Sequence, residues 1–177
     1  RACDEYVKLS YQYPESEYVA ETITHLGRYF LTKGSAMQKE AVDLDSTDKV
    51  AAEKKRLDAR NLFRTAGSVF GKLRERFPTH NLAAKTTVLA GMCLMQGQEW
   101  ADAVKTLDLV VNDKQIDDPD LKSEALYWRG DTYLRKIEAA GGKGDVTDAG
   151  EAYRTFKLLT WNYPDTKWAK FARGRLL

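Results

Sequence analysis

Small and apolar residues recur along this chain with a spacing that predicts amphipathic helices. An Ala is followed four positions later by an aromatic residue, three positions after that by Leu, and the Pro comes eight positions after the aromatic. Residues at i, i+4 and i+7 share one face of an α-helix, and Pro ends a helix because it lacks an amide hydrogen. The frame occurs three times: Ala2–Tyr6–Leu9–Tyr13–Pro14, Ala66–Phe70–Leu73–Phe77–Pro78 and Ala152–Phe156–Leu159–Tyr163–Pro164.

A second pattern precedes or follows these frames and is built around a Gly. Because Gly has no side chain, it leaves room where two helices nearly touch. We therefore expect a close helix crossing at each of these glycines. The pattern also occurs three times: Ile23-x2-Leu26-Gly27-x2-Phe30, Thr87-x2-Ala90-Gly91-x2-Leu94 and Leu126-x2-Arg129-Gly130-x2-Tyr133.

Together the two patterns resemble the tetratricopeptide repeat, whose signature is W-x2-L-G-x2-Y, then A-x3-F, then P. The chain departs from that signature, since Ile23, Thr87 and Leu126 stand at the Trp position and Gln115 stands where the central repeat would have Pro. The resemblance implies an all-α fold, a right-handed α-solenoid of stacked antiparallel helix pairs whose first helices line a concave wall.

The distance from each Gly to the next Ala locates insertions. Gly91 and Ala103 are twelve residues apart, as a repeat of about 34 residues requires, whereas Gly27 is thirty-nine residues from Ala66 and Gly130 is twenty-two from Ala152. The chain opens and closes within a repeat, so we expect a single segment of a larger protein. Its expected parts are a partial repeat 1–14, a repeat with an inserted arm 15–78, a repeat 79–117, a repeat with a loop insertion 118–164 and a partial repeat 165–177.

The longest insertion predicts one elongated helical hairpin. A helix is expected from Glu17 to about residue 42, although Gly34 and Ser35 could weaken it, and a second helix from Lys49 to Phe77 after a capped turn over 45–48. The insertion adds two helical extensions of roughly thirteen residues, which gives an arm over 36–62 that projects roughly 20 Å. A flexible loop is the alternative, but the segment is rich in helix-forming residues.

Composition narrows the function classes. The net charge of +2 and the 31% of charged residues favour neither nucleic acid nor an anionic membrane as a partner, and the balanced charge argues against single-stranded RNA binding by helical repeats. No apolar run approaches the ~20 residues of an integral membrane span. Cys3 and Cys93 fit small buried hydrophobic positions better than a bridge.

Several segments superficially resemble chemical sites. The run 141–144 lacks the spacing of a phosphate-binding loop, and 43–48 has Asp48 where a calcium loop needs Gly. His25 and His80 form no metal-ligand pair, with His80 expected in a turn and His25 on a helix surface. We therefore expect no catalytic residue, no metal, no cofactor and no enzymatic activity.

The candidate partner-binding surface is the concave wall of the solenoid. Its residues should lie three positions before each Gly or one after it, with one more a turn further along. A wall of this composition suits an extended peptide or an amphipathic helix of another protein, although the same residues could instead face water or the rest of a parent chain. The candidates are Thr24, Arg28, Val88, Met92, Tyr127, Asp131 and Arg135.

Two further alternatives concern role and compartment. The segment could be a structural spacer of a larger repeat protein, with the arm 36–62 as its contact element.

After each aromatic-Pro pair, the form Pro-x-[Ser/Thr]-x-aromatic-Ala is similar to tetratricopeptide proteins of the bacterial envelope, of the β-barrel assembly lipoprotein and Tol–Pal coordinator type. That resemblance implies the bacterial periplasm or cell envelope, and the alternative is the cytoplasm.

Overall fold

The computed structural model describes residues 5, 8, 12–13, 16–142 and 145–176. Within that part of the chain there are seven α-helices and no strand, which confirms the all-α prediction. The expected helix over 2–13 falls almost entirely outside the described residues. The helices are α2 (Glu17–Leu44), α3 (Lys49–Arg76), α4 (Ala83–Gln96), α5 (Trp100–Val111), α6 (Pro119–Ala139), α7 (Val146–Asn162) and α8 (Lys167–Arg175).

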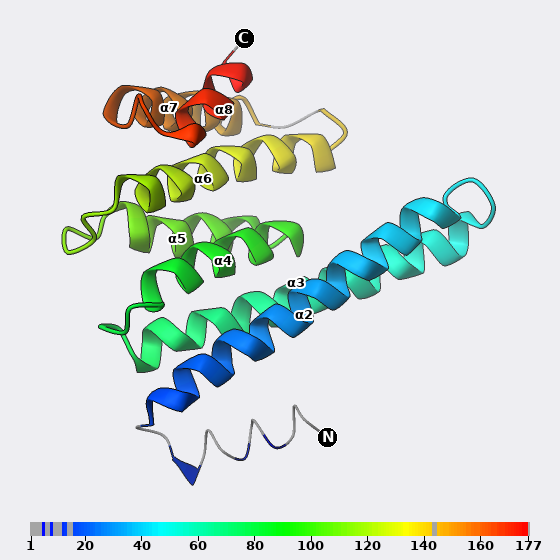
Figure 1. Ribbon diagram of the computed structural model, residues 1–177. Coiled ribbons are helices and arrows are strands. Elements are labelled where there is room, and N and C mark those ends of the chain that lie inside the picture. The colour runs from blue at the N-terminus through cyan, green and yellow to red at the C-terminus, as the bar shows by residue number, and fades with distance from the viewer. Residues whose placement is uncertain (1–4, 6–7, 9–11, 14–15, 143–144, 177) are drawn as a thin grey trace.

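The helices stack as consecutive antiparallel pairs (Figure 1). Each helix from α2 to α7 packs against the next one along the chain, and α6 also contacts α4 and α8. The first helices of successive pairs therefore touch from α4 to α8, as in a tetratricopeptide-like stack. At the other end of the stack, the α2–α3 hairpin is much longer than the pairs above it and projects beyond them.

The repeated Ala-aromatic-Leu frame forms the core. Phe70, Leu73, Phe156 and Leu159 are all buried, and Leu107 occupies the aromatic position of the central repeat. α3 and α7 end at Arg76 and Asn162, and their C-cap residues, Phe77 and Tyr163, come one residue before the Pro of each frame. The spacing along the sequence thus marks both the buried face and the end of each second helix.

Each predicted crossing glycine lies beneath a side chain of this same frame. A Cβ atom built on Gly27 would lie 2.5 Å from Phe70, and one built on Gly91 would lie 2.5 Å from Leu107. At Gly130 the corresponding distance to Phe156 is 2.7 Å. These separations are shorter than carbon–carbon contacts allow, so only Gly lets the paired helices approach this closely.

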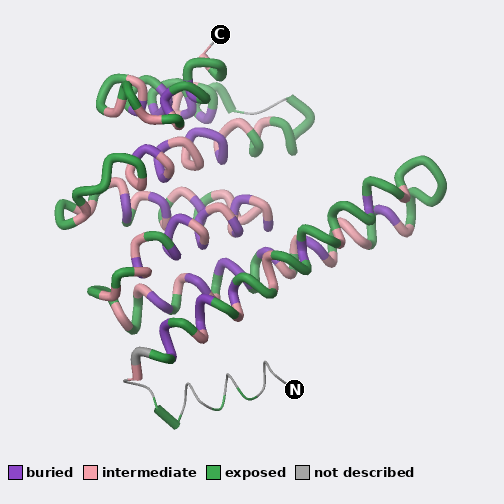
Figure 2. Tube along the Cα trace, viewed as in Figure 1, coloured by how far each residue is buried: buried purple, intermediate pink, exposed green. Residues whose placement is uncertain are grey.

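The α2–α3 hairpin, whose outer part is the arm, is close-packed, as expected. Buried positions recur along both of its helices almost to the tip (Figure 2). On α2 the buried Ala and Gly residues recur seven positions apart, the period of an antiparallel coiled coil. These residues are Ala20, Gly27, Gly34 and Ala41. Ala52, Ala59 and Ala66 repeat the spacing on α3.

Gly34 does not weaken α2, which runs without interruption from Glu17 to Leu44. A Cβ atom at Gly34 would lie 2.9 Å from Phe63, so this glycine repeats the Gly27–Phe70 contact two turns further out. At the tip, Asp48 caps α3 by accepting hydrogen bonds from the amides of Val50 and Ala51. Ion pairs from Lys55 to Glu40 and from Arg56 to Asp45 cross the hairpin.

Candidate partner-binding site

Arg28, Met92 and Arg135 are the predicted groove residues whose side chains reach the surface. Arg28 and Arg135 are exposed, and Met92 is half-buried. They lie on α2, α4 and α6, which are the first helices of three successive pairs.

Thr24 and Val88 are buried instead. The Thr24 hydroxyl donates to the Ala20 carbonyl one turn earlier on α2, at 2.9 Å. Val88 packs in a core cluster with Leu107 and Val110 of α5 and Ala125 of α6. The periodicity placed Val88 on the same face as Met92, but the next repeat covers that part of α4. Neither side chain is placed to touch a partner directly, and both support the wall from behind.

Tyr127 and Asp131 join α6 to α8. The Tyr127 ring lies 5.1 Å from the Trp168 ring and 5.9 Å from the Phe156 ring, between centroids. The Asp131 carboxylate is 1% exposed and accepts from Arg135 and Arg175, each at 2.7 Å. Contact with the Tyr127 hydroxyl and with the Asp131 carboxylate raises the pKa of Arg175. Because both residues hold α8 in place, any role in binding is combined with a structural one.

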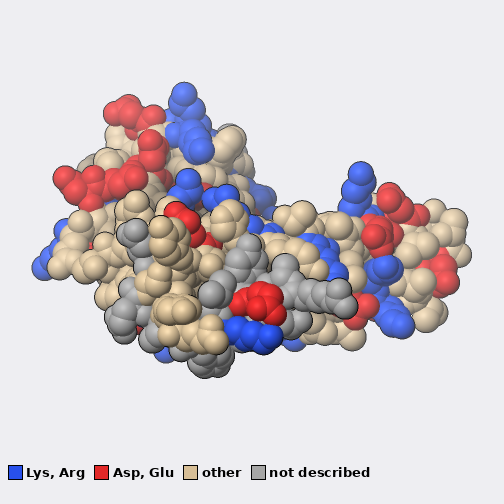
Figure 3. Space-filling view, turned by 60° about the horizontal axis from the view of Figure 1, so that its bottom comes forward, with Lys and Arg blue, Asp and Glu red and all other residues tan. Residues whose placement is uncertain are grey.

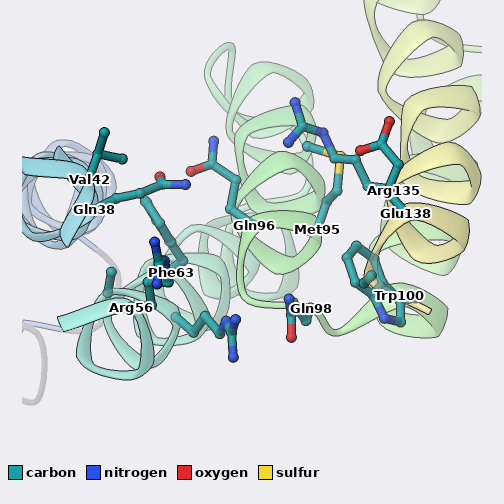
Figure 4. Close-up of a pocket in the computed structure, with 13 residues that line it drawn as sticks. Gln38, Val42, Arg56, Phe63, Met95, Gln96, Gln98, Trp100, Arg135 and Glu138 are labelled. Atoms are coloured by element: carbon teal, nitrogen blue, oxygen red, sulfur yellow. The ribbon is translucent and has the colours of Figure 1, made fainter. Parts of the chain in front are cut away.

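A cleft of about 480 Å³ lies where the arm leaves the stack (Figure 4). α2 and α3 form one wall, the turn between α4 and α5 forms the base, and the last turn of α6 forms the opposite wall. One predicted groove residue, Arg135, lies in this cleft. The cleft is lined by Gln38, Val42, Arg56, Ala59, Arg60, Phe63, Met95, Gln96, Gln98, Trp100, Arg135, Glu138 and Ala139.

Several polar side chains of the cleft have no partner among the residues that the structure describes. No hydrogen bond within the described part of the chain is made by four of these side chains: the amide groups of Gln38, Gln96 and Gln98 and the indole N–H of Trp100. In Figure 4, Gln38 extends from α2 into the cleft, and Arg135 extends from α6 toward Gln96. Each free amide can both donate and accept a hydrogen bond, so the cleft offers partners to a polar backbone.

Arg64 fixes the base of the cleft. Its Nε donates to the Gly97 carbonyl at 2.9 Å and also lies 2.6 Å from a carboxylate oxygen of Glu99. A Cβ atom at Gly97 would lie 2.8 Å from Arg64 Cγ, so Gly allows the turn to press against α3. The left-handed conformation after α4 is taken by Gln98, with φ of 64°. Arg64 thus holds the α4–α5 turn against the arm.

The face of the molecule shown in Figure 3 has mixed charge. Figure 3 shows acidic and basic side chains interspersed over the displayed face, and the arm projects away from the body of the molecule. The net charge of +2 agrees with this distribution. A polyanion such as nucleic acid would need a continuous basic surface, which is not seen on this face.

Most of the cleft could not be found from the repeat spacing. Gln38 lies in the arm and Phe63 directly follows it, both outside the repeat signature, whereas Gln98 lies in the α4–α5 turn and Trp100 is the first residue of α5. One signal was present in the sequence. Gly34 lies seven residues after Gly27, and Phe63 lies seven residues before Phe70, so the second pair repeats the contact of the first. That signal identifies the packed face of the arm, but not the angle at which the arm leaves the stack.

Comparison with protein families identifies the chain. A family model described as YfiO, outer membrane lipoprotein, matches residues 47–177. The chain belongs to this family. The comparisons with curated proteins and with solved structures gave no match.

Membership in the YfiO family confirms the predicted resemblance to tetratricopeptide-like proteins of the bacterial envelope, and it places the chain among envelope proteins. The matched span begins in the turn at the tip of the arm and includes every cleft residue except Gln38 and Val42. No helix in the described part of the chain has the length and apolar character of a membrane span.

Proposed function

We propose that this YfiO-family chain is a non-enzymatic scaffold that binds a segment of another protein in the periplasm and serves assembly of the bacterial envelope. The partner's peptide or helix would lie across α2, α4 and α6, where Arg28 and Met92 reach the surface, and would end in the cleft at Arg135. The cleft is the observation that carries the proposal, because its amides lack internal partners and its apolar side chains border them. Such a combination is typical of peptide-binding grooves.

The chemistry of the lining supports binding over catalysis. The lining residues of the cleft include no His, Cys, Ser or Lys that could act as a nucleophile or a general base. Its single carboxylate, Glu138, lies at the exposed end of α6. A site with these groups can hold a polypeptide but has no pair of groups for transferring a proton.

Crosslinking in cells tests the proposal. A photoreactive amino acid at Gln96 or Met92 should form a crosslink to a discrete partner protein, because both positions lie on the proposed binding surface. The same group at Leu158, a 43% exposed position on the outer face of α7, is the matched control and should form none. Equal crosslinking from all three positions, or crosslinking from Leu158 alone, would contradict the proposal.

A spacer role with the arm as contact element is the second candidate. It is favoured by apolar side chains that the arm leaves exposed, with Val50 83% exposed, Val42 64% and Leu57 51%. Alanine substitution of Met37, Leu44 or Leu57 should abolish partner capture under this model, whereas substitution of Arg28 or Met92 should abolish it under the groove model. Tyr127 and Asp131 are poor choices for this test because their loss also removes the packing of α8.

A further inference from the structure

We infer that the cleft between the arm and the α4–α5 turn selects an extended acidic segment, in which a Glu or Asp lies next to an apolar residue. This inference rests on the proposed scaffold function and specifies the chemistry of the segment bound. It follows from three features of the lining: the state of its arginines, the geometry of its free amides and its apolar surface.

The first feature is an excess of positive charge that internal ion pairs neutralise only in part. Three arginines line the cleft against one acid, Glu138. Arg56 already forms ion pairs through both of its terminal amino groups, one with Asp45 and the other with Glu53. Arg60 makes no hydrogen bond in the described part of the chain, and its nearest carboxylate, that of Glu53, lies 3.8 Å away.

Arg135, on the opposite wall, uses only its Nε, which bonds to Asp131 at 2.7 Å. Its two terminal amino groups make no hydrogen bond within the described residues. A guanidinium binds a carboxylate through parallel N–H donors, and a charge-assisted bond of this kind is about twice as strong as a neutral one. Arg60 and Arg135 are therefore available to hold carboxylates from two sides of the cleft.

The second feature favours an extended segment over a helix. The backbone amides and carbonyls of a helix are paired within the helix, so a helix has little use for free side-chain amides. An extended segment leaves its N–H and C=O groups open, and the amides of Gln38, Gln96 and Gln98 can pair with both kinds of group. These three glutamines come from the arm and from the end of α4 and its following turn, so they lie along one wall and the base of the cleft.

The third feature provides the place for an apolar side chain. Phe63 and Met95 form a closed floor, each 1% exposed, and Trp100 is half-buried beside them. Val42 adds an exposed apolar group at the rim. The volume of about 480 Å³ lies within the range of roughly 300–1,000 Å³ found for ligand pockets, which suits a few residues and not a whole domain.

Fluorescence anisotropy with a labelled peptide tests the inference on the full chain. The probe is the capped peptide Gly-Ser-Glu-Leu-Glu-Val-Ser-Gly, compared with versions in which both Glu are replaced by Gln or by Lys. The Glu peptide should bind at least tenfold more tightly than the Gln version, and the Lys version should not bind. N-methylation of alternate backbone amides should remove binding if the glutamines recognise the main chain.

Variants of the protein identify the groups responsible. The double variant Arg60→Gln with Arg135→Gln should weaken binding of the Glu peptide at least tenfold and remove its salt dependence. Arg154→Gln, at a guanidinium on α7 whose side chain is 76% exposed, makes a similar charge change outside the cleft and should leave binding unchanged. Arg135→Gln also removes one of the two ion pairs of Asp131, so circular dichroism at the assay temperature must show that all three proteins are folded.

Two results would overturn the inference. If the Glu and Lys peptides bind equally, the arginines do not select charge. If no peptide binds while Gln96 still crosslinks to a partner in cells, the scaffold function stands and its partner docks by another kind of surface. Failure of both the peptide and the crosslinking experiments would instead remove the proposed function itself.

Discussion

The Phe156 ring of α7 lies directly on Gly130 of α6, so closely that a Cβ atom there would be 2.7 Å from the ring. The same relationship joins α2 to α3 through Gly27 and Phe70, and α4 to α5 through Gly91 and Leu107. In each pair the large side chain comes from the second helix and the Gly from the first. This contact sets the distance between the helices of every pair described.

Gly130→Ala should therefore destabilise the protein. Ala is the better helix former by about 1 kcal/mol, but the added methyl group must displace a buried ring, which costs about 1–3 kcal/mol. Because the two effects oppose each other, we expect a net loss of up to about 2 kcal/mol in the free energy of unfolding, measured by urea denaturation. The matched control is Gly150→Ala in α7, where no atom lies within 4 Å of the added Cβ. It should gain about 0.5–1 kcal/mol, and an equal gain at Gly130 would refute the packing argument.

Gly34→Ala should loosen the arm and leave the stack intact. The added methyl group would lie 2.9 Å from Phe63, whose ring is buried between α2 and α3. Hydrogen exchange should become faster over residues 36–62 and stay unchanged in α6 and α7. Gly71→Ala, in α3 with no atom within 4 Å of the new Cβ, is the control and should not accelerate exchange. Uniform acceleration through all helices would show that the arm is not a separate packing unit.

Asp131→Asn should release α8. The carboxylate is 1% exposed and binds both Arg135 and Arg175, whose side chains are 46% and 40% exposed. Because both arginines can return to water, we expect a loss of about 1–3 kcal/mol, less than for a fully buried pair. Hydrogen exchange of α8 reports the change. Glu151→Gln removes an ion pair to the exposed Arg154 and should cost no more than about 0.5 kcal/mol.

Cys93 should be unreactive in the folded protein. Its thiol is fully buried, and burial raises the pKa of Cys93 to about 12. The thiolate is the reactive form, so at pH 8 alkylation should be slow in buffer and rapid in denaturant. The measurement uses a Cys3→Ser variant, which leaves Cys93 as the one thiol in the chain. Rapid labelling without denaturant would mean that α4 opens readily.

Asp113 should contribute to stability only above about pH 4. Hydrogen bonding from the Gln115 amide and the ion pair with Arg74 lower the pKa of Asp113 from its ordinary value of 3.8. An acid whose pKa is lowered by folding stabilises the folded state above its unfolded pKa, and this stabilisation is lost as the pH falls.

Asp113→Asn should therefore lower the free energy of unfolding at pH 6 and reduce its fall below pH 4, measured by urea denaturation across the pH range. Asp117→Asn is the control on the same loop, because Asp117 has no hydrogen bond or ion pair in the described residues. If both variants change the free energy of unfolding alike, the ion pair between Arg74 of α3 and Asp113 of the α5–α6 loop does not contribute to stability.

Helix positions, buried faces and glycine crossings were all predictable from the sequence. These features depend on spacings of three, four and seven residues, which bring side chains together within one helix or on two adjacent helices. For the same reason, Ala66, Phe70, Ala152 and Phe156 of the Ala-x3-Phe frames were correctly assigned to the core. Val88 and Thr24 show the limit of this reasoning, because helical spacing identifies a face but not which neighbouring helix covers it.

The sequence by itself therefore determined an all-α repeat protein with one elongated hairpin and crossing glycines, because these depend on local periodicity. Only the tertiary structure decided where a partner could bind. The cleft combines Gln38 of α2, Phe63 of α3, Trp100 of α5 and Arg135 of α6, which are separated by up to ninety-seven residues. They meet because the α2–α3 hairpin extends beyond the ends of the helices stacked on it. The angle of that extension is set by packing between helices.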